Sequence, residues 1–178
     1  MSPRLVLVGG PGAGKSTVGN LLAQRWNLEL VDTDSLVEAQ AGITVADIFI
    51  TQGEDRFREL ERDVVAAALS AHDGVLALGG GAILDEGTRT LLRNQPVVFL
   101  QADPSDASAR IGLNRDRPLL LGNVRGQLMA LMAQRLEFYT SVAKWSVDTS
   151  GLNPDQVADA VESLMESSHQ VDPQEAQS

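Results

Sequence analysis

A glycine-rich segment near the amino terminus has the composition and spacing of a phosphate-binding loop. The pattern is Gly9-x-x-x-x-Gly14-Lys15-Ser16, and it follows an apolar run at residues 5–8. Glycines allow consecutive backbone N–H groups to surround an anion, and a helix beginning near Lys15 adds its own unpaired N–H groups. Lys15 offers a charge to the β- and γ-phosphates, and the Ser16 hydroxyl can ligate Mg²⁺. The pattern predicts a site for a nucleoside triphosphate.

Two aspartates, Asp32 and Asp34, follow the second apolar run. Residues two apart on an extended segment face the same way, and the carboxyl ends of parallel strands are where open sheets bind ligands. One carboxylate could reach the water shell of Mg²⁺, and the other could accept the proton of an attacking hydroxyl or orient that hydroxyl. The alternative is that Asp34 only caps a helix beginning at Ser35.

A charged face is expected on the helix at residues 54–70, where Arg58, Glu61 and Arg62 have the spacing i, i+3 and i+4. In one interpretation, Glu61 holds Arg58 so that its guanidinium can meet a substrate carboxylate. In the other, these side chains form a solvated, salt-bridged surface.

The third apolar run ends in Gly79-Gly80-Gly81, and no aspartate ends this strand as it does in GTPases and motor ATPases. Three consecutive glycines favour the close approach of a ligand to the backbone. A tight turn between a strand and a helix is the alternative, although one or two glycines would suffice for it.

The elements that position these residues alternate between short apolar runs and longer amphipathic segments. Strands are expected at 5–8, 28–31, 75–78, 97–100 and 145–148, and helices at 15–25, 35–41, 45–51, 54–70, 86–94, 105–111, 125–142 and 154–166. Thr44, Asp85 and Asn153 occupy N-cap positions, and Gly42 suits a helix end. The alternation predicts an α/β fold with a parallel sheet covered by helices on both faces.

Composition restricts the class of protein further. The chain has 178 residues, 43% of them hydrophobic, with a net charge of −10 and no cysteine. We expect one domain over residues 1–178, without disulfides or thiolate metal sites. The negative charge argues against nucleic acid and anionic membranes as partners. Without an apolar run of membrane-spanning length or a leader, we expect a cytoplasmic protein.

Two segments do not fit the layered pattern. Residues 112–122 lie between glycines and contain Arg115, Arg117 and Pro118, a composition typical of a mobile flap. Residues 167–178 are polar, and we expect them to form a frayed tail.

The motifs, in this order, resemble the shikimate kinase family, and the actinobacterial form most. The resemblance covers residues 4–166. Its most specific segments are Asp-Thr-Asp at 32–34, Phe-Arg at 57–58, Gly-Gly-Gly at 79–81, Arg-Pro-Leu-Leu at 117–120 and Gln-Arg-Leu-Glu-Phe-Tyr at 134–139. It implies a nucleoside-monophosphate-kinase-like fold of three α/β/α layers, with a five-stranded parallel sheet, an acceptor-binding region at about 33–61 and a lid at about 112–122.

The implied reaction is transfer of the γ-phosphoryl group of ATP to the 3-hydroxyl of shikimate, with Mg²⁺, by a monomeric enzyme. This is a step toward chorismate and the aromatic amino acids. The catalytic residues would be Lys15, Asp34 and Arg117, and Ser16 and Asp32 would hold the magnesium. ATP would contact Gly12, Ala13, Gly14, Lys15, Ser16, Thr17, Arg110, Arg117, Asn153 and Pro154. Shikimate would contact Asp34, Phe49, Phe57, Arg58, Glu61, Gly79, Gly80, Gly81 and Arg135.

One departure from the family pattern lies beside the expected adenine site, where Leu152 stands in place of an arginine. Three rival functions are weighed against the main hypothesis. They are a kinase resembling gluconate kinase or adenylate kinase, a nucleotide-dependent switch, and a non-catalytic nucleotide-binding module. The switch would need a guanine-selecting Asn-Lys-x-Asp motif, which the sequence lacks. The module predicts loss of Lys15, Asp34 or Arg117, and all three are present.

Overall fold

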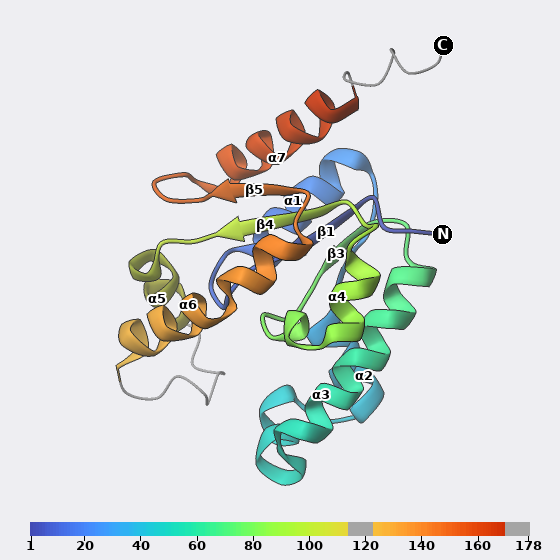
Figure 1. Ribbon diagram of the computed structural model, residues 1–178, viewed down its shortest axis with the longest axis vertical. Helices are drawn as coiled ribbons and strands as arrows, with labels where there is room; N and C mark the ends of the chain where they lie inside the picture. Colours follow the sequence, from blue (N-terminus) through green and yellow to red (C-terminus); the bar gives the residue numbers. More distant parts are fainter. Residues whose placement is uncertain (114–122, 170–178) are drawn as a thin grey trace.

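One parallel sheet forms the centre of the computed structural model, which describes residues 1–113 and 123–169 (Figure 1). Its strand order is β2-β3-β1-β4-β5, so β1 lies in the middle. The strands are β1 (Leu5–Val8), β2 (Leu30–Asp32), β3 (Val75–Ala77), β4 (Val97–Gln101) and β5 (Trp145–Asp148). All four pairings are parallel. The ends of β1, β2 and β3 therefore bring residues 9–17, 32–34 and 79–81 to one edge of the sheet, as open α/β sheets do for ligand binding.

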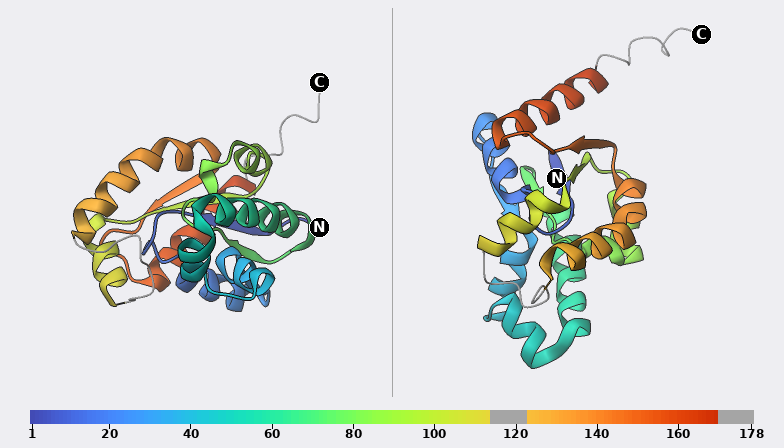
Figure 2. Two further views of the ribbon diagram at one scale, coloured as in Figure 1. Left: turned by 90° about the horizontal axis from the view of Figure 1, so that it is seen from below. Right: turned by 90° about the vertical axis from the view of Figure 1, so that its left-hand side faces the viewer.

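Helices cover both faces of the sheet (Figure 2). They are α1 (Lys15–Trp26), α2 (Thr33–Ala41), α3 (Val45–Ala71), α4 (Glu86–Leu92), α5 (Pro104–Leu113), α6 (Val124–Val142) and α7 (Pro154–His169), with a short 3-10 helix η1 (Ala82–Leu84). Alternation along β1 divides the core, because successive side chains of a strand point to opposite faces. Leu5 and Leu7 pack with α1, α5 and α7, whereas Val6 and Val8 pack with α3, α4 and α6.

A third apolar cluster joins α2 to α3 at the end of the molecule below the sheet in Figure 1. Helix α3 breaks at Gly53, which has φ 85° and ψ 168°. Glycine adopts this conformation without the penalty that a side chain would bring. The prediction of two helical segments separated near residue 53 is confirmed.

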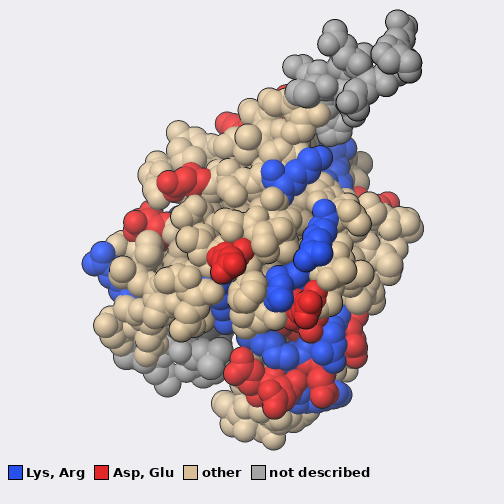
Figure 3. All heavy atoms as spheres, viewed as in Figure 1, with Lys and Arg blue, Asp and Glu red and all other residues tan. Residues whose placement is uncertain are grey.

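Charged side chains of both signs gather over this same end of the molecule (Figure 3). Ion pairs there join Arg56 to Glu59 at 3.0 Å and Arg62 to Asp85 at 3.6 Å. Arg62 therefore belongs to a surface pair and does not join Arg58 and Glu61.

The N-caps predicted at Thr44, Asp85 and Asn153 are confirmed, because each side chain accepts a hydrogen bond from a backbone N–H in the first turn of the helix that follows. The strand predicted at 28–31 begins two residues later than expected, at Leu30, and ends at Asp32. Asn27 closes α1 in the left-handed conformation, with φ 52°. The Leu28 N–H then bonds to Ala23 O at 2.8 Å, so Leu28 belongs to the helix-ending turn and the strand begins at Leu30.

The expected frayed tail at 167–178 was also wrong in its first residues, since α7 continues to His169. Ser167 and Ser168 bond back to carbonyls one turn earlier, and Trp145 Nε1 donates to Ser168 Oγ at 2.8 Å. The remaining residues, 170–178, and the predicted lid residues 114–122 lie outside the described part of the chain. Within the described part, no helix is long and apolar enough to cross a membrane.

Candidate active site

The loop between β1 and α1 has the backbone shape that its glycines predict. Gly12 and Gly14 have φ of 73° and 88°, in the left-handed region that glycine alone enters freely. A Cβ on Gly12 would lie 2.6 Å from the carbonyl oxygen of Ala107, so the loop also packs too closely against α5 for a side chain. Lys15 Nζ donates to Gly9 O at 2.8 Å and to Gly10 O at 3.0 Å, which holds the ammonium group across the loop.

Arg110 brings a second positive charge to this loop from α5. Its Nη1 donates to Gly12 O at 2.9 Å, and the side chain is exposed to solvent. Arg110 therefore lies at the mouth of the phosphate loop, where it could contact a bound nucleotide.

Asp32 links the phosphate loop to the end of β2. Its Oδ2 accepts from Ser16 Oγ at 2.9 Å, and its Oδ1 accepts from the Asp34 N–H at 2.9 Å. Asp32 is thus the N-cap of α2, which begins at Thr33. The alternative in which Asp34 caps a helix beginning at Ser35 was wrong, and the cap is the other aspartate of the pair.

The donor set of Ser16 and Asp32 fits magnesium, because Mg²⁺ prefers oxygen ligands and usually keeps several waters beside one or two carboxylates and the substrate phosphates. Among the residues described, no three His, Cys, Asp or Glu side chains form a group that could hold a metal by themselves. A hydroxyl and a carboxylate in contact at the rim of the phosphate loop are what a magnesium–triphosphate complex would require from the protein.

A cavity of about 200 Å³ connects the phosphate loop with the ends of β2 and β3. It therefore places predicted phosphate contacts and predicted acceptor contacts around one space. Its lining residues are Gly12, Ala13, Gly14, Lys15, Ser16, Thr17, Asp32, Asp34, Leu78, Gly79, Gly80, Arg110 and Ile111.

Gly79 lies between two carboxylates on the acceptor side of this cavity. A Cβ at Gly79 would be 2.6 Å from Asp34 Oδ1 and also 2.6 Å from Glu61 Oε1. The Gly79 N–H donates to Thr33 Oγ1 at 2.9 Å, and Thr33 is fully buried. The absence of a side chain at Gly79 is therefore what allows Asp34 and Glu61 to approach the end of β3.

Arg58 and Glu61 form a close ion pair on α3. Arg58 Nη1 donates to Glu61 Oε2 at 2.6 Å, and Glu61 is only 3% exposed. The prediction that Glu61 holds Arg58 is confirmed, and the alternative of a wholly solvated face was wrong. A Cβ at Gly81 would clash with the guanidinium of Arg58, so this turn gives the arginine its space.

The Arg58–Glu61 pair is not fully satisfied within the described chain. Arg58 Nε and Glu61 Oε1 are both buried without a hydrogen-bond partner. Burial raises the pKa of the Glu61 carboxyl, with a smaller contribution from the charge of Asp34, while Arg58 and Arg135 oppose the rise. Because native structures pair almost all buried polar atoms, such atoms mark a place where a ligand could supply the partner.

Arg135 approaches this corner from α6, since its charge acts on Glu61 and on Tyr139. The phenyl rings of Phe49 and Phe57 lie 4.7 Å apart between their centroids, in the apolar cluster of α2 and α3. The Arg58 guanidinium lies 5.2 Å from the centroid of the Phe57 ring. Phe57 thus lies beside Arg58 and Phe49 packs on Phe57, and neither ring lines the described cavity.

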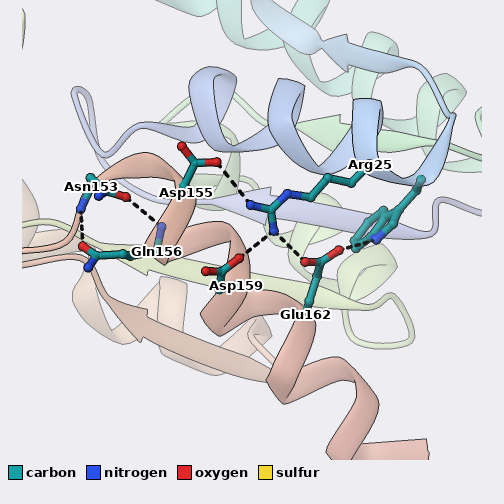
Figure 4. A network of polar contacts seen from close by, with 7 residues as sticks. Arg25, Asn153, Asp155, Gln156, Asp159 and Glu162 are labelled. Atoms are coloured by element: carbon teal, nitrogen blue, oxygen red, sulfur yellow. Dashed lines mark hydrogen bonds and ion pairs between the residues drawn. The ribbon is translucent and has the colours of Figure 1, made fainter.

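The predicted adenine contacts are less closely gathered. Asn153 caps α7, where Asn153 and Gln156 exchange two hydrogen bonds of 2.9 Å (Figure 4). Asn153 and Pro154 do not line the cavity, and Leu152 packs against the core. Arg117 falls outside the described residues, so its predicted role stays a prediction.

Sequence reasoning assigned no role to two residues that build the acceptor wall. Thr33 was seen only as the middle of Asp-Thr-Asp, and Tyr139 only as the end of a family motif. Tyr139 donates its hydroxyl hydrogen to Gly80 O at 2.5 Å, across 59 positions of sequence. A polar residue at the centre of a motif and the single tyrosine of the chain were the available signals.

The fold and this cavity define a class of protein: a phosphate-loop α/β protein with a built pocket for a second, small ligand beside the nucleotide. The shikimate kinase family model matches residues 11–166. A shikimate kinase from Thermobifida fusca is 52% identical over 89% of this chain and 92% of its own length. Another, from Frankia casuarinae, is 55% identical over 87% of this chain and 69% of its own.

A solved structure indicates the same family as these relatives. The shikimate kinase from Acinetobacter baumannii in complex with shikimate superposes with a TM-score of 0.89 and 33% identity, over 94% of both chains. The chain belongs to the shikimate kinase family.

Proposed function

We propose that the chain transfers the γ-phosphoryl group of ATP to the 3-hydroxyl of shikimate, giving 3-phosphoshikimate for aromatic amino acid biosynthesis. The observation that carries the proposal is the cavity that joins the phosphate loop to Asp34 and to the glycine wall, as we call residues Gly79–Gly81. Membership of the family supplies the substrate, and the relative from Acinetobacter baumannii is described in complex with shikimate.

The nucleotide half of the proposal rests on residues 12–17. Their backbone N–H groups would surround the phosphates, and Lys15 would place its charge on the β- and γ-phosphates. The hydrogen bonds of Lys15 to Gly9 O and Gly10 O hold the ammonium group beside the loop. Arg110 would lie near the adenine, and Asn153 and Pro154 would line the far side of the base.

Magnesium would be held by Ser16 directly and by Asp32 through its water shell. When bound, the ion neutralises charge on the β- and γ-phosphate oxygens. The protein's own part is to keep the Ser16 hydroxyl and the Asp32 carboxylate in contact, 2.9 Å apart, at the rim of the loop.

Asp34 is the proposed base or orienting group for the attacking hydroxyl. It lines the cavity together with the phosphate loop, and its Oδ1 lies beside Gly79. A carboxylate in this position would hydrogen-bond shikimate hydroxyls and take up the proton as the phosphoryl group transfers. Because phosphoryl transfer depends mostly on alignment, holding the hydroxyl in line is the larger part of this role.

The carboxylate of shikimate would bind Arg58 and Arg135. Glu61 occupies Nη1 of Arg58, while the buried Nε has no partner among the described residues. Nη2 makes a long bond of 3.4 Å to the exposed Glu54, so a substrate carboxylate could replace Glu54 there and also reach Nε. Gly80 would donate a backbone N–H to a shikimate hydroxyl, with Gly79 and Gly81 shaping the wall and Phe49 and Phe57 supporting it.

Several further parts of the hypothesis stay predictions. Arg117 would move in with the lid, contact the transferring phosphate and help to exclude water. A monomeric state, a cytoplasmic location, and the lack of nucleic-acid or membrane partners belong to the same set. The monomeric state is checked by the mass of the enzyme in solution.

The test is ADP release with Mg-ATP and a panel of acceptors: shikimate, quinate, gluconate, AMP and none. We expect fast, saturable release with shikimate alone, and a single phosphate ester at its 3-position in the product. Release that ignores shikimate and responds to gluconate or AMP would overturn the acceptor assignment and leave the phosphate loop standing. ATP binding without acceptor-dependent release would favour a non-catalytic module.

A further inference from the structure

Tyr139 is the only tyrosine of the chain, and it is almost completely buried on α6, at 2% exposure. Its ring stacks on Phe99 of β4, with centroids 4.9 Å apart and an angle of 15° between the planes. The stack fixes the ring against the sheet and leaves the hydroxyl at the end of β3. There it donates to Gly80 O at 2.5 Å.

The glycine wall needs such an anchor because three consecutive glycines have little conformational preference of their own. Two backbone hydrogen bonds join the three glycines to η1, from Ala82 N–H to Gly79 O at 3.0 Å and from Leu84 N–H to Gly81 O at 3.1 Å. From other elements, two side-chain hydroxyls reach it, Thr33 at the Gly79 N–H and Tyr139 at Gly80 O.

The bond to Gly80 O orients a whole peptide unit. The C=O of Gly80 and the N–H of Gly81 belong to one planar trans peptide and point in opposite directions. A donor that holds the carbonyl in the core therefore turns the neighbouring N–H away from the core. It also restricts the preceding Gly79–Gly80 peptide, whose N–H is the proposed contact to a substrate hydroxyl.

The same hydroxyl lies beside Arg135, four residues earlier and on the same face of α6. The positive charge of Arg135 acts on the Tyr139 hydroxyl and favours its ionised form. Burial raises the pKa of the Tyr139 hydroxyl, while Arg135 and Arg58 lower it and Glu61 raises it, for a net increase. The hydroxyl thus keeps its proton near neutral pH and remains a donor.

We infer that Tyr139 is a positioning residue for the second substrate, since its hydroxyl holds the Gly80 carbonyl at the end of β3. The inference rests on the proposed function, because the Gly80 N–H is assigned there to a shikimate hydroxyl. Tyr139 itself is assigned no contact with the substrate and acts through this glycine segment.

The test is the steady-state kinetics of Tyr139→Phe, which keeps the ring and removes the hydroxyl. The KM for shikimate should rise about tenfold, the effect of a buried acceptor losing its donor. The KM for ATP should stay within about twofold, because the proposed role of Tyr139 concerns the acceptor side alone. A general loss of the fold would instead change the KM for both substrates. Thr140→Val is the matched control, since the exposed Thr140 hydroxyl bonds to Leu136 O and Glu137 O of its own helix.

A second measurement does not depend on the folding of a variant. Replacing tyrosine with 3-fluorotyrosine labels one site in the chain, and its ¹⁹F resonance should shift when shikimate is added and much less when ADP is added. Resonance shifts of equal size with both ligands, or no shift with shikimate, would overturn the inference.

The two proposals fail in different ways. If the wild-type enzyme does not phosphorylate shikimate, the proposed function has failed. If the wild type is active and Tyr139→Phe changes both KM values equally, or neither, the positioning role alone has failed. A selective rise in the KM for shikimate, absent from Thr140→Val, supports it.

Discussion

The phosphate side of the cavity takes its groups from one stretch, residues 9–17, whereas the acceptor side gathers them from residues 32–34, 58–61, 79–81 and 135–139. On the phosphate side we expect backbone N–H groups to do most of the binding, and the Lys15 ammonium is held by its own loop. On the acceptor side the side chains dominate, and two buried polar atoms, Arg58 Nε and Glu61 Oε1, have no partner in the described chain. We therefore expect a largely preformed phosphate site and an acceptor site that its ligand completes.

The largest effect is expected on the phosphate side. Lys15→Met should lower kcat by about 10³-fold, because a preorganised charge at the transferring group is lost. The chain offers a matched control in its only other lysine, since Lys144 packs over the Trp145 ring, 4.8 Å from the centroid. Lys144→Met should keep normal turnover in the same ADP-release assay. Similar losses in both variants would show that charge at Lys15 has no special role.

A loss of at least about 10²-fold in kcat is expected for Asp34→Asn, the contribution typical of a general base. ATP binding should be unchanged, because asparagine keeps the size of the side chain and the backbone N–H that bonds to Asp32 Oδ1. Isothermal titration with an ATP analogue and turnover with shikimate separate the two effects. Asp63→Asn, an exposed position on α3, is the control. Near-normal turnover of Asp34→Asn would remove this residue from the chemistry.

Arg58→Ala should act on one substrate only. The KM for shikimate should rise about 30-fold, the range of a charge-assisted hydrogen bond, and the KM for ATP should hardly change. Arg56→Ala removes an exposed arginine on the same helix that pairs with Glu59 at 3.0 Å, and it should leave both constants alone. Equal changes in both KM values for Arg58→Ala would mean that Arg58 serves the fold and not the acceptor.

The smallest effect concerns Glu61 and pH. The pKa of Glu61 in the folded protein is raised above its ordinary value of 4.5. Between pH 4.5 and the folded-state pKa, the folded protein therefore binds more protons than the unfolded chain. The associated stability is present below pH 4.5 and is lost as the pH rises through the folded pKa. Glu61→Gln cannot titrate, so its urea midpoint should fall less across this range than that of the wild type. Glu59→Gln, on the exposed surface, should follow the wild type. Parallel curves for all three proteins would contradict the raised pKa.

The same contrast decides how much the sequence could predict. The phosphate loop is contiguous, so its motif and its place between a strand and a helix identified it from spacing alone. Helix caps such as Thr44 and Asp85 are also local and were predicted correctly. The pair of Arg58 and Glu61 followed from helical spacing, although only the structure shows that Glu61 is buried.

What spacing could not supply depends on contacts between distant segments. Leu28 looked like the start of a strand, and only the folded turn after α1 shows that its N–H bonds to Ala23 O. Which aspartate caps α2 depends on the exact start of that helix, which apolar periodicity does not fix. The bond of Tyr139 to Gly80 joins residues 59 positions apart, so no local pattern contains it. Among the acceptor residues, Arg135, Phe49 and Phe57 came from family resemblance alone, whereas Asp34, Arg58, Glu61 and the three glycines were already candidates from residue type and spacing.

Gly79 is a position where adding any side chain would disturb other residues of the site. Two carboxylate oxygens, from Asp34 and Glu61, each lie 2.6 Å from the point where any other amino acid would place its first side-chain carbon. One methyl group there would push at least one of these carboxylates aside. A substitution at Gly79 would therefore change the proposed base or the partner of Arg58 at the same time as the wall itself.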